Sequence, residues 1–179
     1  MNNIENLKTL LAQPKRIAIL SHRNPDGDAI GSSLGLQKYL DNINHQTTVL
    51  FPSEFPDFVE WMEGSENIVI YDNAPEQAEE IVKNAEIIFC LDFNGLSRID
   101  ELGKIVEAQT ETTKVLIDHH INPEPFADFT LSDISAIVPP VDITPPQTCL
   151  TEIDNANTSP EADVICLESG TYTFTGHDN

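Results

Sequence analysis

The sequence predicts an α/β fold, a doubly wound and mainly parallel β-sheet that is incomplete at its C-terminal end. Short apolar runs typical of buried strands alternate with segments of helical period over residues 1–136. Polar clusters follow three of these runs, and ligands bind beyond the carboxyl ends of parallel strands. We therefore divide the chain into one folded domain, residues 1–136, and an acidic tail, residues 137–179.

The individual elements follow from the spacing of the apolar residues. Helical period predicts helices near residues 4–11, 28–40, 75–84 and 99–108. Short apolar runs predict buried strands at residues 16–21, 47–51, 67–71, 85–92 and 114–120, with a candidate edge strand at 126–133. Pro14 ends the first helix, and Pro52 and Pro56 break the chain after the second strand.

The tail from Ile137 to Asn179 differs from the rest of the chain. It contains repeated prolines and no sustained period, and the last basic residue of the sequence is Lys114. Such a composition predicts loop or weakly ordered chain, with a short strand at 171–174.

The composition limits the classes of partner. The net charge is −21, with 30 acidic residues against nine basic ones, which excludes a broad electrostatic footprint for long duplex nucleic acid. A small anionic substrate fits if metal ions supply positive charge locally. No signal peptide and no apolar run of about 20 residues is present, so we expect no membrane association. Cys90, Cys149 and Cys166 are widely spaced and predict free thiols in a reducing, cytoplasmic compartment.

The first polar cluster is SHRNPDGD, which follows the first strand and contains His22, Asp26 and Asp28. Carboxylates are preferred by Mg²⁺ and Mn²⁺, and an added imidazole favours Mn²⁺ or another transition metal. Pro25 and Gly27 allow a sharp turn between the two carboxylates. The alternative interpretation is a simple turn with a helix cap.

The second cluster begins at Asp92, which ends the apolar run EIIFCLD. A buried carboxylate at that position needs a metal, an arginine or a helix N-terminus. A cap for the helix near Ile99 is the alternative. Arg98, six residues later, is a candidate salt-bridge partner or phosphate clamp.

The third cluster is Asp118, His119 and His120, at the end of the next strand. Adjacent side chains of a strand point to opposite faces, so both histidines reach one site only if the strand ends there. Pro123 predicts that end. An Asp beside a His commonly fixes the tautomer of a metal-binding imidazole, whereas a surface histidine pair is the alternative.

The three clusters together resemble the first three motifs of the DHH phosphoesterase family, in the right order. The matching motifs are HxxxDxD at residues 22–28, LDFNxLSR at 91–98 and DHH at 118–120. Within the family, NPDGDAIGSSLGL and DFNGLSRI look most like the branch of bifunctional oligoribonucleases and PAP phosphatases. The resemblance implies that residues 1–136 are a partial DHH phosphoesterase metal-binding domain.

The resemblance implies two ions, Mn²⁺ or alternatively Mg²⁺. His22, Asp26 and Asp92 would hold one ion, and Asp28, Asp92 and His119 the other, with Asp92 as the bridge. Two divalent ions about 4 Å apart can clamp an in-line displacement at phosphorus.

The resemblance also implies roles toward the substrate. His120 would contact the phosphate or protonate the leaving oxygen, and Asp118 would orient the histidines. Asn24 and Arg98 are weaker candidates for phosphate contact. The implied substrates are short RNA oligonucleotides and nucleoside bisphosphates such as 3′-phosphoadenosine 5′-phosphate. Cyclic-dinucleotide phosphodiesterases and type II inorganic pyrophosphatases share these metal motifs and are the alternatives. The sequence carries no signal for an oligomeric state.

The chain departs from the family pattern after Ile137. Family members have a fourth aspartate motif and a C-terminal substrate domain with basic residues, and we expect neither in residues 137–179. His177 and Asp178 are poor substitutes for the missing ligand. We expect a truncated or frame-disrupted version of a longer product, with impaired activity. A genuinely shorter enzyme and a non-catalytic relic or binding module are the alternatives.

Overall fold

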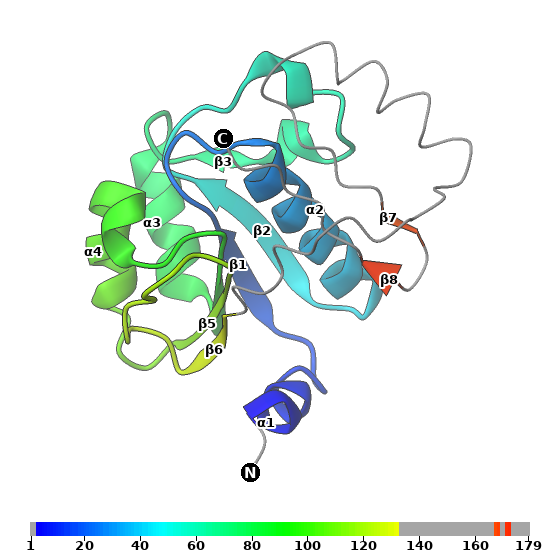
Figure 1. Ribbon diagram of the computed structural model, residues 1–179, viewed down its shortest axis with the longest axis vertical. Helices are drawn as coiled ribbons and strands as arrows, with labels where there is room; N and C mark the ends of the chain where they lie inside the picture. The colour runs from blue at the N-terminus through cyan, green and yellow to red at the C-terminus, as the bar shows by residue number, and fades with distance from the viewer. Residues whose placement is uncertain (1–2, 133–166, 169–170, 173–179) are drawn as a thin grey trace.

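The computed structural model describes residues 3–132, 167–168 and 171–172. Residues 3–132 form one sheet covered by helices on both faces (Figure 1). The strands of this sheet are β1 (Arg16–Leu20), β2 (Gln46–Phe51), β3 (Val69–Ile70), β4 (Ile87–Leu91), β5 (Thr113–Asp118) and β6 (Phe129–Ser132). The α-helices are α1 (Asn3–Leu10), α2 (Gly27–Asn42), α3 (Pro75–Asn84) and α4 (Asp100–Glu107). Three short 3₁₀ helices are η1 (Asp57–Val59), η2 (Ser65–Asn67) and η3 (Leu96–Ile99).

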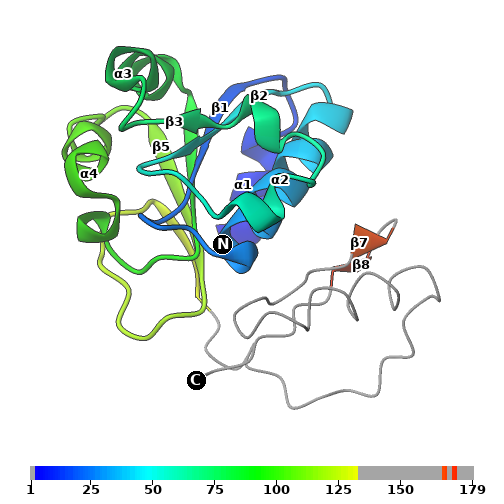
Figure 2. The ribbon, with the colours of Figure 1, turned by 90° about the horizontal axis from the view of Figure 1, so that it is seen from above.

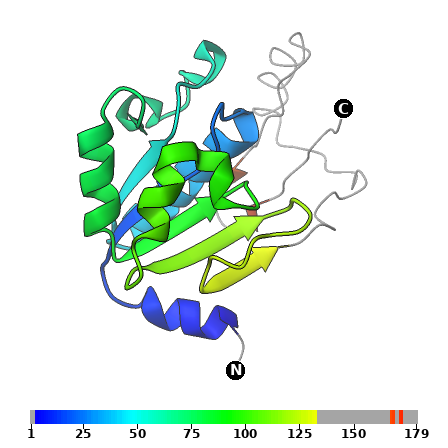
Figure 3. The same ribbon diagram turned by 90° about the vertical axis from the view of Figure 1, so that its left-hand side faces the viewer.

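The six strands are all parallel and lie in the order β3-β2-β1-β4-β5-β6. Figure 3 shows the strand arrows running in one direction. The strand order therefore reverses direction between β1 and β4. Crevices for ligands form at such a reversal, beyond the carboxyl ends of the strands. The predicted doubly wound α/β sheet is confirmed, with β6 as its edge strand.

Each face of the sheet has its own apolar core, because successive strand residues point to opposite sides. Ile17 and Ile19 pack on the face covered by α2, with α1 residues against the same cluster. Ala18 and Leu20 pack on the other face, beneath α3 and α4. Figure 2 shows these two helical layers on either side of the sheet. β1 and β4 are buried on both faces, which explains their continuous apolar sequences.

The predicted elements are present, with most of their ends shifted by one to three residues, and two of these shifts have a local cause. The strand predicted at 67–71 is only Val69–Ile70, because Ser65–Asn67 forms a 3₁₀ turn. The helix predicted to begin at Asp28 begins at Gly27 instead, because the Asp26 carboxylate accepts a hydrogen bond from the Ala29 N–H and caps it.

Part of the predicted tail is also described. β7 (Leu167–Glu168) pairs antiparallel with β8 (Thr171–Tyr172), which confirms a strand at the first two residues of the predicted 171–174. The other residues of the 137–179 tail, with Cys149, Cys166, His177 and Asp178, lie outside the described residues. Cys90 is a free, buried thiol, and burial raises its pKa to about 12. None of the described helices is long and apolar enough to cross a membrane.

Candidate metal centre

Asp92 lies at the centre of a polar cluster at the carboxyl edge of the sheet, next to the point where the strand order reverses. One of its carboxylate oxygens is 3.6 Å from Nε2 of His22, in the loop after β1. The other is 3.5 Å from Nε2 of His119 and 3.8 Å from Nδ1 of His120, after β5. The Asp92 side chain is only 11% exposed. Three imidazoles from two other strand ends therefore surround one carboxylate.

The backbone directs the Asp92 side chain into this cluster. Asp92 has a φ of 60°, and its N–H donates to the carbonyl of Ile117 at 3.0 Å, which ties the end of β4 to β5. Among the described residues no lysine or arginine pairs with Asp92. It caps no helix either, since α4 has Ile99 at its N-cap without a side-chain hydrogen bond. The helix-cap interpretation of Asp92 is therefore wrong.

The ring of His22 is fixed by its own neighbour. Nδ1 of His22 lies 2.9 Å from the carbonyl oxygen of Arg23, which can only accept, so Nδ1 carries the proton and Nε2 faces Asp92. Burial by itself lowers the pKa of His22. The hydrogen bonds to Asp92 and to the Arg23 carbonyl raise the pKa by more than burial lowers it, so the net shift is upward. This upward shift indicates a local excess of negative charge that a cation would relieve.

Asp26 has two functions in the structure. Its carboxylate caps α2 through the Ala29 N–H at 3.0 Å, and it also lies 4.0 Å from Nε2 of His22. The interpretation of PDGD as a turn with a helix cap is therefore correct for Asp26. The cap does not prevent Asp26 from also serving as a metal ligand. Asp28 lies in the first turn of α2, two residues further on.

Two groups of side chains have ligand atoms close enough to share a metal ion. The first is His22, Asp26 and Asp92, and the second is Asp92, His119 and His120, with ligand atoms within 4.8 Å of one another in each group. Asp92 belongs to both groups, as expected for a bridging carboxylate, whereas Asp28 belongs to neither. Mixed nitrogen and oxygen donors fit a divalent transition metal. The residues present therefore fit a metal centre with two neighbouring ions.

His119 and His120 reach the same cluster because β5 ends at Asp118. The chain then turns through Asn122, whose φ is 57°, and the two rings lie 4.9 Å apart at 39° to each other. The two histidines differ in their partners. Nδ1 of His120 donates to the Asp118 carboxylate at 2.7 Å, which leaves Nε2 as its free nitrogen. His119 is therefore the better placed of the two as a ligand beside Asp92.

Asp118 is the most deeply buried carboxylate of the site. Its side chain is 0% exposed, and its Oδ2 atom has no hydrogen-bond partner among the residues that the structure describes. A buried oxygen without a partner costs free energy, so the sequence keeps Asp118 at a cost in stability. The one bond that it does make orients His120.

Asn24 and Arg98 lie beside the two groups rather than in them. Asn24, with a φ of 53°, donates its N–H to Oγ of Ser53 at 2.8 Å. The Arg98 side chain is exposed, and no ion pair to it is recorded in residues 3–132. Its backbone carbonyl accepts the Arg23 N–H at 3.0 Å, so it stays close to the first ligand loop.

The structure also shows residues that the sequence did not single out. The guanidinium of Arg23 pairs with Asp72, after β3, and with Asp100, at the start of α4. The position of Asp72 just after a strand is a signal that could have been used, since the other candidate residues share it. Nothing in the sequence pairs Asp72 with Arg23.

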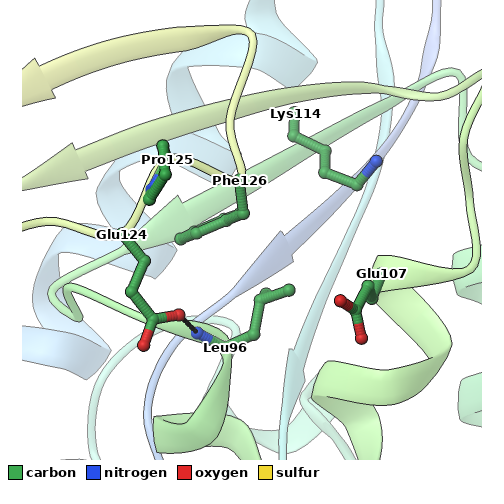
Figure 4. A pocket seen from close by; sticks show the side chains of 6 residues that line it. All are labelled: Leu96, Glu107, Lys114, Glu124, Pro125 and Phe126. Atoms are coloured by element: carbon green, nitrogen blue, oxygen red, sulfur yellow. Dashed lines mark hydrogen bonds between the residues drawn. The ribbon is translucent and has the colours of Figure 1, made fainter.

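A separate hollow of about 490 Å³ lies away from these residues (Figure 4). It is lined by Leu96, Glu107, Lys114, Glu124, Pro125 and Phe126. The Glu124 carboxylate accepts the N–H of Leu96 at 3.1 Å, so its charge is already engaged in holding a loop. None of the candidate metal ligands lines this hollow.

Comparison with known proteins finds two curated relatives of this chain. It is 28% identical over 125 residues to the cyclic-di-AMP phosphodiesterase PdeA of Listeria monocytogenes, and 24% identical over 127 residues to the cyclic-di-AMP phosphodiesterase GdpP of Geobacillus thermodenitrificans. These matches cover 67% and 68% of this chain but 19% of each relative. The chain thus spans about a fifth of the length of these curated relatives.

A solved structure and a family model agree with these matches. An exopolyphosphatase-related protein from Bacteroides fragilis superposes with a TM-score of 0.72 at 45% identity, covering 74% of this chain and 38% of that one. The model of the DHH family, N-terminal domain, matches residues 16–166, which include the three motifs and extend past the predicted boundary at 136. The chain therefore belongs to the DHH family and carries its N-terminal domain.

Proposed function

We propose that this chain forms the metal-binding part of a hydrolase that cleaves a phosphate ester with two divalent ions, Mn²⁺ by preference and Mg²⁺ as an alternative. One observation carries the proposal: Asp92 is shared by two ligand groups at the carboxyl edge of a parallel sheet. The imidazoles of His22 and His119 favour Mn²⁺ over Mg²⁺, which prefers oxygen ligands.

The chain's own residues have distinct tasks in this proposal. When bound, the two ions would supply Lewis-acid charge at the phosphoryl group. His22, Asp26, Asp28, Asp92 and His119 would hold them. His120, with Nδ1 held by Asp118 at 2.7 Å, presents Nε2 to the phosphate or the leaving oxygen. Arg98 and Asn24 contact the substrate phosphate from the edge of the site.

The proposed substrates are short oligoribonucleotides, trimmed from an end, and 3′-phosphoadenosine 5′-phosphate. The motifs NPDGDAIGSSLGL and DFNGLSRI support this choice by their resemblance to the oligoribonuclease and PAP phosphatase branch. The net charge of −21 also supports a small substrate over long duplex nucleic acid or an anionic membrane surface. A cytoplasmic location belongs to the same proposal.

Cyclic dinucleotides are the second candidate substrate class, because PdeA and GdpP are cyclic-di-AMP phosphodiesterases. Cleavage of a phosphoanhydride is a third, supported by the exopolyphosphatase-related neighbour. A non-catalytic module that binds metal or nucleotide is the remaining alternative.

A substrate panel with Mn²⁺ separates these possibilities. We expect mononucleotide release from di- and trinucleotide RNA, faster than hydrolysis of cyclic-di-AMP or pyrophosphate.

The matched control is the double variant His119→Ala, His120→Ala. Activity that survives this change does not come from the proposed site. Preferential cleavage of cyclic-di-AMP would move the chain to the second class, and Mn²⁺ binding without any hydrolysis would identify the binding module.

A further inference from the structure

Arg23 connects three loops at the carboxyl edge of the sheet. Its Nη1 and Nη2 atoms each lie 2.9 Å from a carboxylate oxygen of Asp72, after β3. Its Nε donates to Asp100, the first residue of α4. The planar guanidinium provides donors in fixed directions, so this double contact fixes the orientation of the side chain.

The backbone of Arg23 is held as firmly as its side chain. Its N–H donates to the Arg98 carbonyl at 3.0 Å, and its own carbonyl accepts from Nδ1 of His22 at 2.9 Å. Arg23, whose carbonyl accepts the hydrogen bond from His22, is therefore held through its backbone N–H as well as through its side chain. In solution an unconstrained imidazole exchanges between its two neutral tautomers, and a hydrogen bond at one nitrogen selects between them.

We propose that Arg23 is a positioning residue, which fixes the tautomer and direction of the His22 ring so that Nε2 faces Asp92. The ion pairs with Asp72 and Asp100 hold the residue, and its carbonyl transmits the constraint to His22. The importance of this for catalysis rests on the proposed metal centre. The tautomer itself is a property of the metal-free chain and can be measured without any metal.

The exposure of these ion pairs indicates that they orient Arg23 rather than stabilise the fold. The side chains of Arg23, Asp72 and Asp100 are 36%, 44% and 50% exposed, and ion pairs this exposed contribute little to overall stability. Arg16 provides a matched comparison, because it is an exposed arginine at the start of β1 and is paired with Glu86 at 3.5 Å. Arg16 lies at the opposite end of β1 and touches no residue of the metal centre.

The first test is nitrogen NMR of His22 in metal-free protein, at a pH where the ring is neutral, comparing wild type with Arg23→Ala, Arg23→Lys and Arg16→Ala. We expect the Nδ1–H tautomer in wild type and in Arg16→Ala, and a mixture of tautomers in Arg23→Ala. Lysine can pair with one carboxylate but cannot bridge two with a rigid fork, so Arg23→Lys should restore the tautomer only in part.

The second test is the Mn²⁺ affinity measured by calorimetry on the same four proteins. Loss of a group that orients a ligand should weaken Mn²⁺ binding by about 10–100-fold in Arg23→Ala, with Arg16→Ala unchanged. An unaltered His22 tautomer in folded Arg23→Ala overturns the proposal. If wild type binds no Mn²⁺ while the tautomer responds to Arg23, the metal centre fails and the positioning role of Arg23 stands.

A third set of variants covers the case in which Arg23→Ala does not fold. Asp72→Asn and Asp100→Asn each remove one ion pair and leave the arginine in place. The double variant should show the mixed His22 tautomers, with each single variant between it and wild type. A double variant that keeps the wild-type tautomer refutes the positioning role.

Discussion

The two ends of the parallel sheet use similar side chains in opposite ways. At the amino end, the Glu86 carboxylate accepts from Nζ of Lys15 and from the N–H of Arg16, both at 3.1 Å. At the carboxyl end, Asp92 is surrounded by imidazoles and has no lysine or arginine partner in the part of the chain that the structure describes. One end neutralises its carboxylate within the fold, and the other keeps its carboxylate available for a cation.

The two ends also differ in how many of their non-glycine residues have a positive φ. Among the described non-glycine residues, Asn44 has a positive φ near the amino end, whereas the loops of the carboxyl end contain Asn24, Asp92, Asp100 and Asn122. Such conformations are costly and persist where the surrounding structure enforces them, often at functional sites. Within the described residues, left-handed backbone conformations therefore gather in the loops of the carboxyl end, where the candidate ligands converge. Four predictions about the two ends follow, from the largest expected effect to the smallest.

Asp92→Asn should have the largest effect, because one carboxylate serves both proposed ions. Mn²⁺ should raise the melting temperature of wild type, since a ligand of the native state stabilises it by mass action. Asp92→Asn should lose most of that increase, and hydrolysis should fall by more than about 100-fold. Differential scanning fluorimetry with and without Mn²⁺ measures the first effect.

The control for Asp92→Asn is Glu86→Gln at the amino end. That variant should keep the full Mn²⁺-dependent increase in melting temperature. Equal Mn²⁺ stabilisation of wild type and Asp92→Asn would show that any ion binds elsewhere.

Asp118→Asn should have the next largest effect. The variant loses the carboxylate that holds Nδ1 of His120, so hydrolysis should fall by about 10–100-fold. The Mn²⁺-dependent rise in melting temperature should persist, because His119 rather than His120 is the proposed ligand. A loss of Mn²⁺ stabilisation in His120→Ala as complete as in Asp92→Asn would instead make His120 a ligand.

Gly103→Ala should destabilise the packing that supports the carboxyl-end loop of Arg98. A Cβ at Gly103 would lie 2.3 Å from the backbone oxygen of Leu96, whereas a Cβ at Gly95 would meet only the movable carboxylate of Glu124. We expect Gly103→Ala to lower the free energy of unfolding by about 1–3 kcal/mol, and Gly95→Ala to lower it less. Urea unfolding of both variants checks the order, and the reverse order would contradict this account of the packing.

The smallest effects should be opposite pH responses of the two ends in metal-free protein. The raised pKa of His22 means that the stability from its protonated form is present below its ordinary value of 6.5 and is lost as pH rises through the raised value. The pKa of Glu86 is lowered by hydrogen bonds from Arg16 and Lys15. Its contribution is therefore present above its ordinary value of 4.5 and is lost as pH falls through the lowered value.

Unfolding free energies measured in EDTA across this range test both signs. Relative to wild type, His22→Gln should lose stability mainly at the acidic end of His22's titration. Glu86→Gln should lose stability mainly above pH 4.5. A shared pH profile for the two variants would contradict the opposite roles assigned to the two ends.

Most of the fold could be predicted because the pattern that carries it is local. β1 and β4 are short apolar runs, α2 and α3 show helical period, and the clusters at residues 22–28, 92 and 118–120 stand at strand ends. The rule that parallel strands share a carboxyl edge then brings Asp92 beside His22 and His119. The two turns at Asp57–Val59 and Ser65–Asn67 were not predicted, because 3₁₀ turns have no sustained period.

The contacts that depend on packing could not be predicted in the same way. The bridge from Arg23 to Asp72 and Asp100 joins residues 49 and 77 positions apart in the chain. No sequence spacing specifies such a pair, since any of the many acidic residues is a possible partner. The different roles proposed for His119 and His120 likewise depend on where the Asp118 carboxylate lies after folding.

The strand order has a consequence for how the protein folds. Residues 16–51 and 87–118 meet along β1 and β4, and the hydrogen bond from Ser21 to Leu91 spans 70 positions. Closing so long a loop is entropically costly, and contacts of this kind slow folding. The proposed ligands His22 and Asp92 come from opposite sides of this seam. The proposed metal centre would therefore assemble only when the two halves of the chain join, and a bound ion would slow unfolding by holding the two halves together.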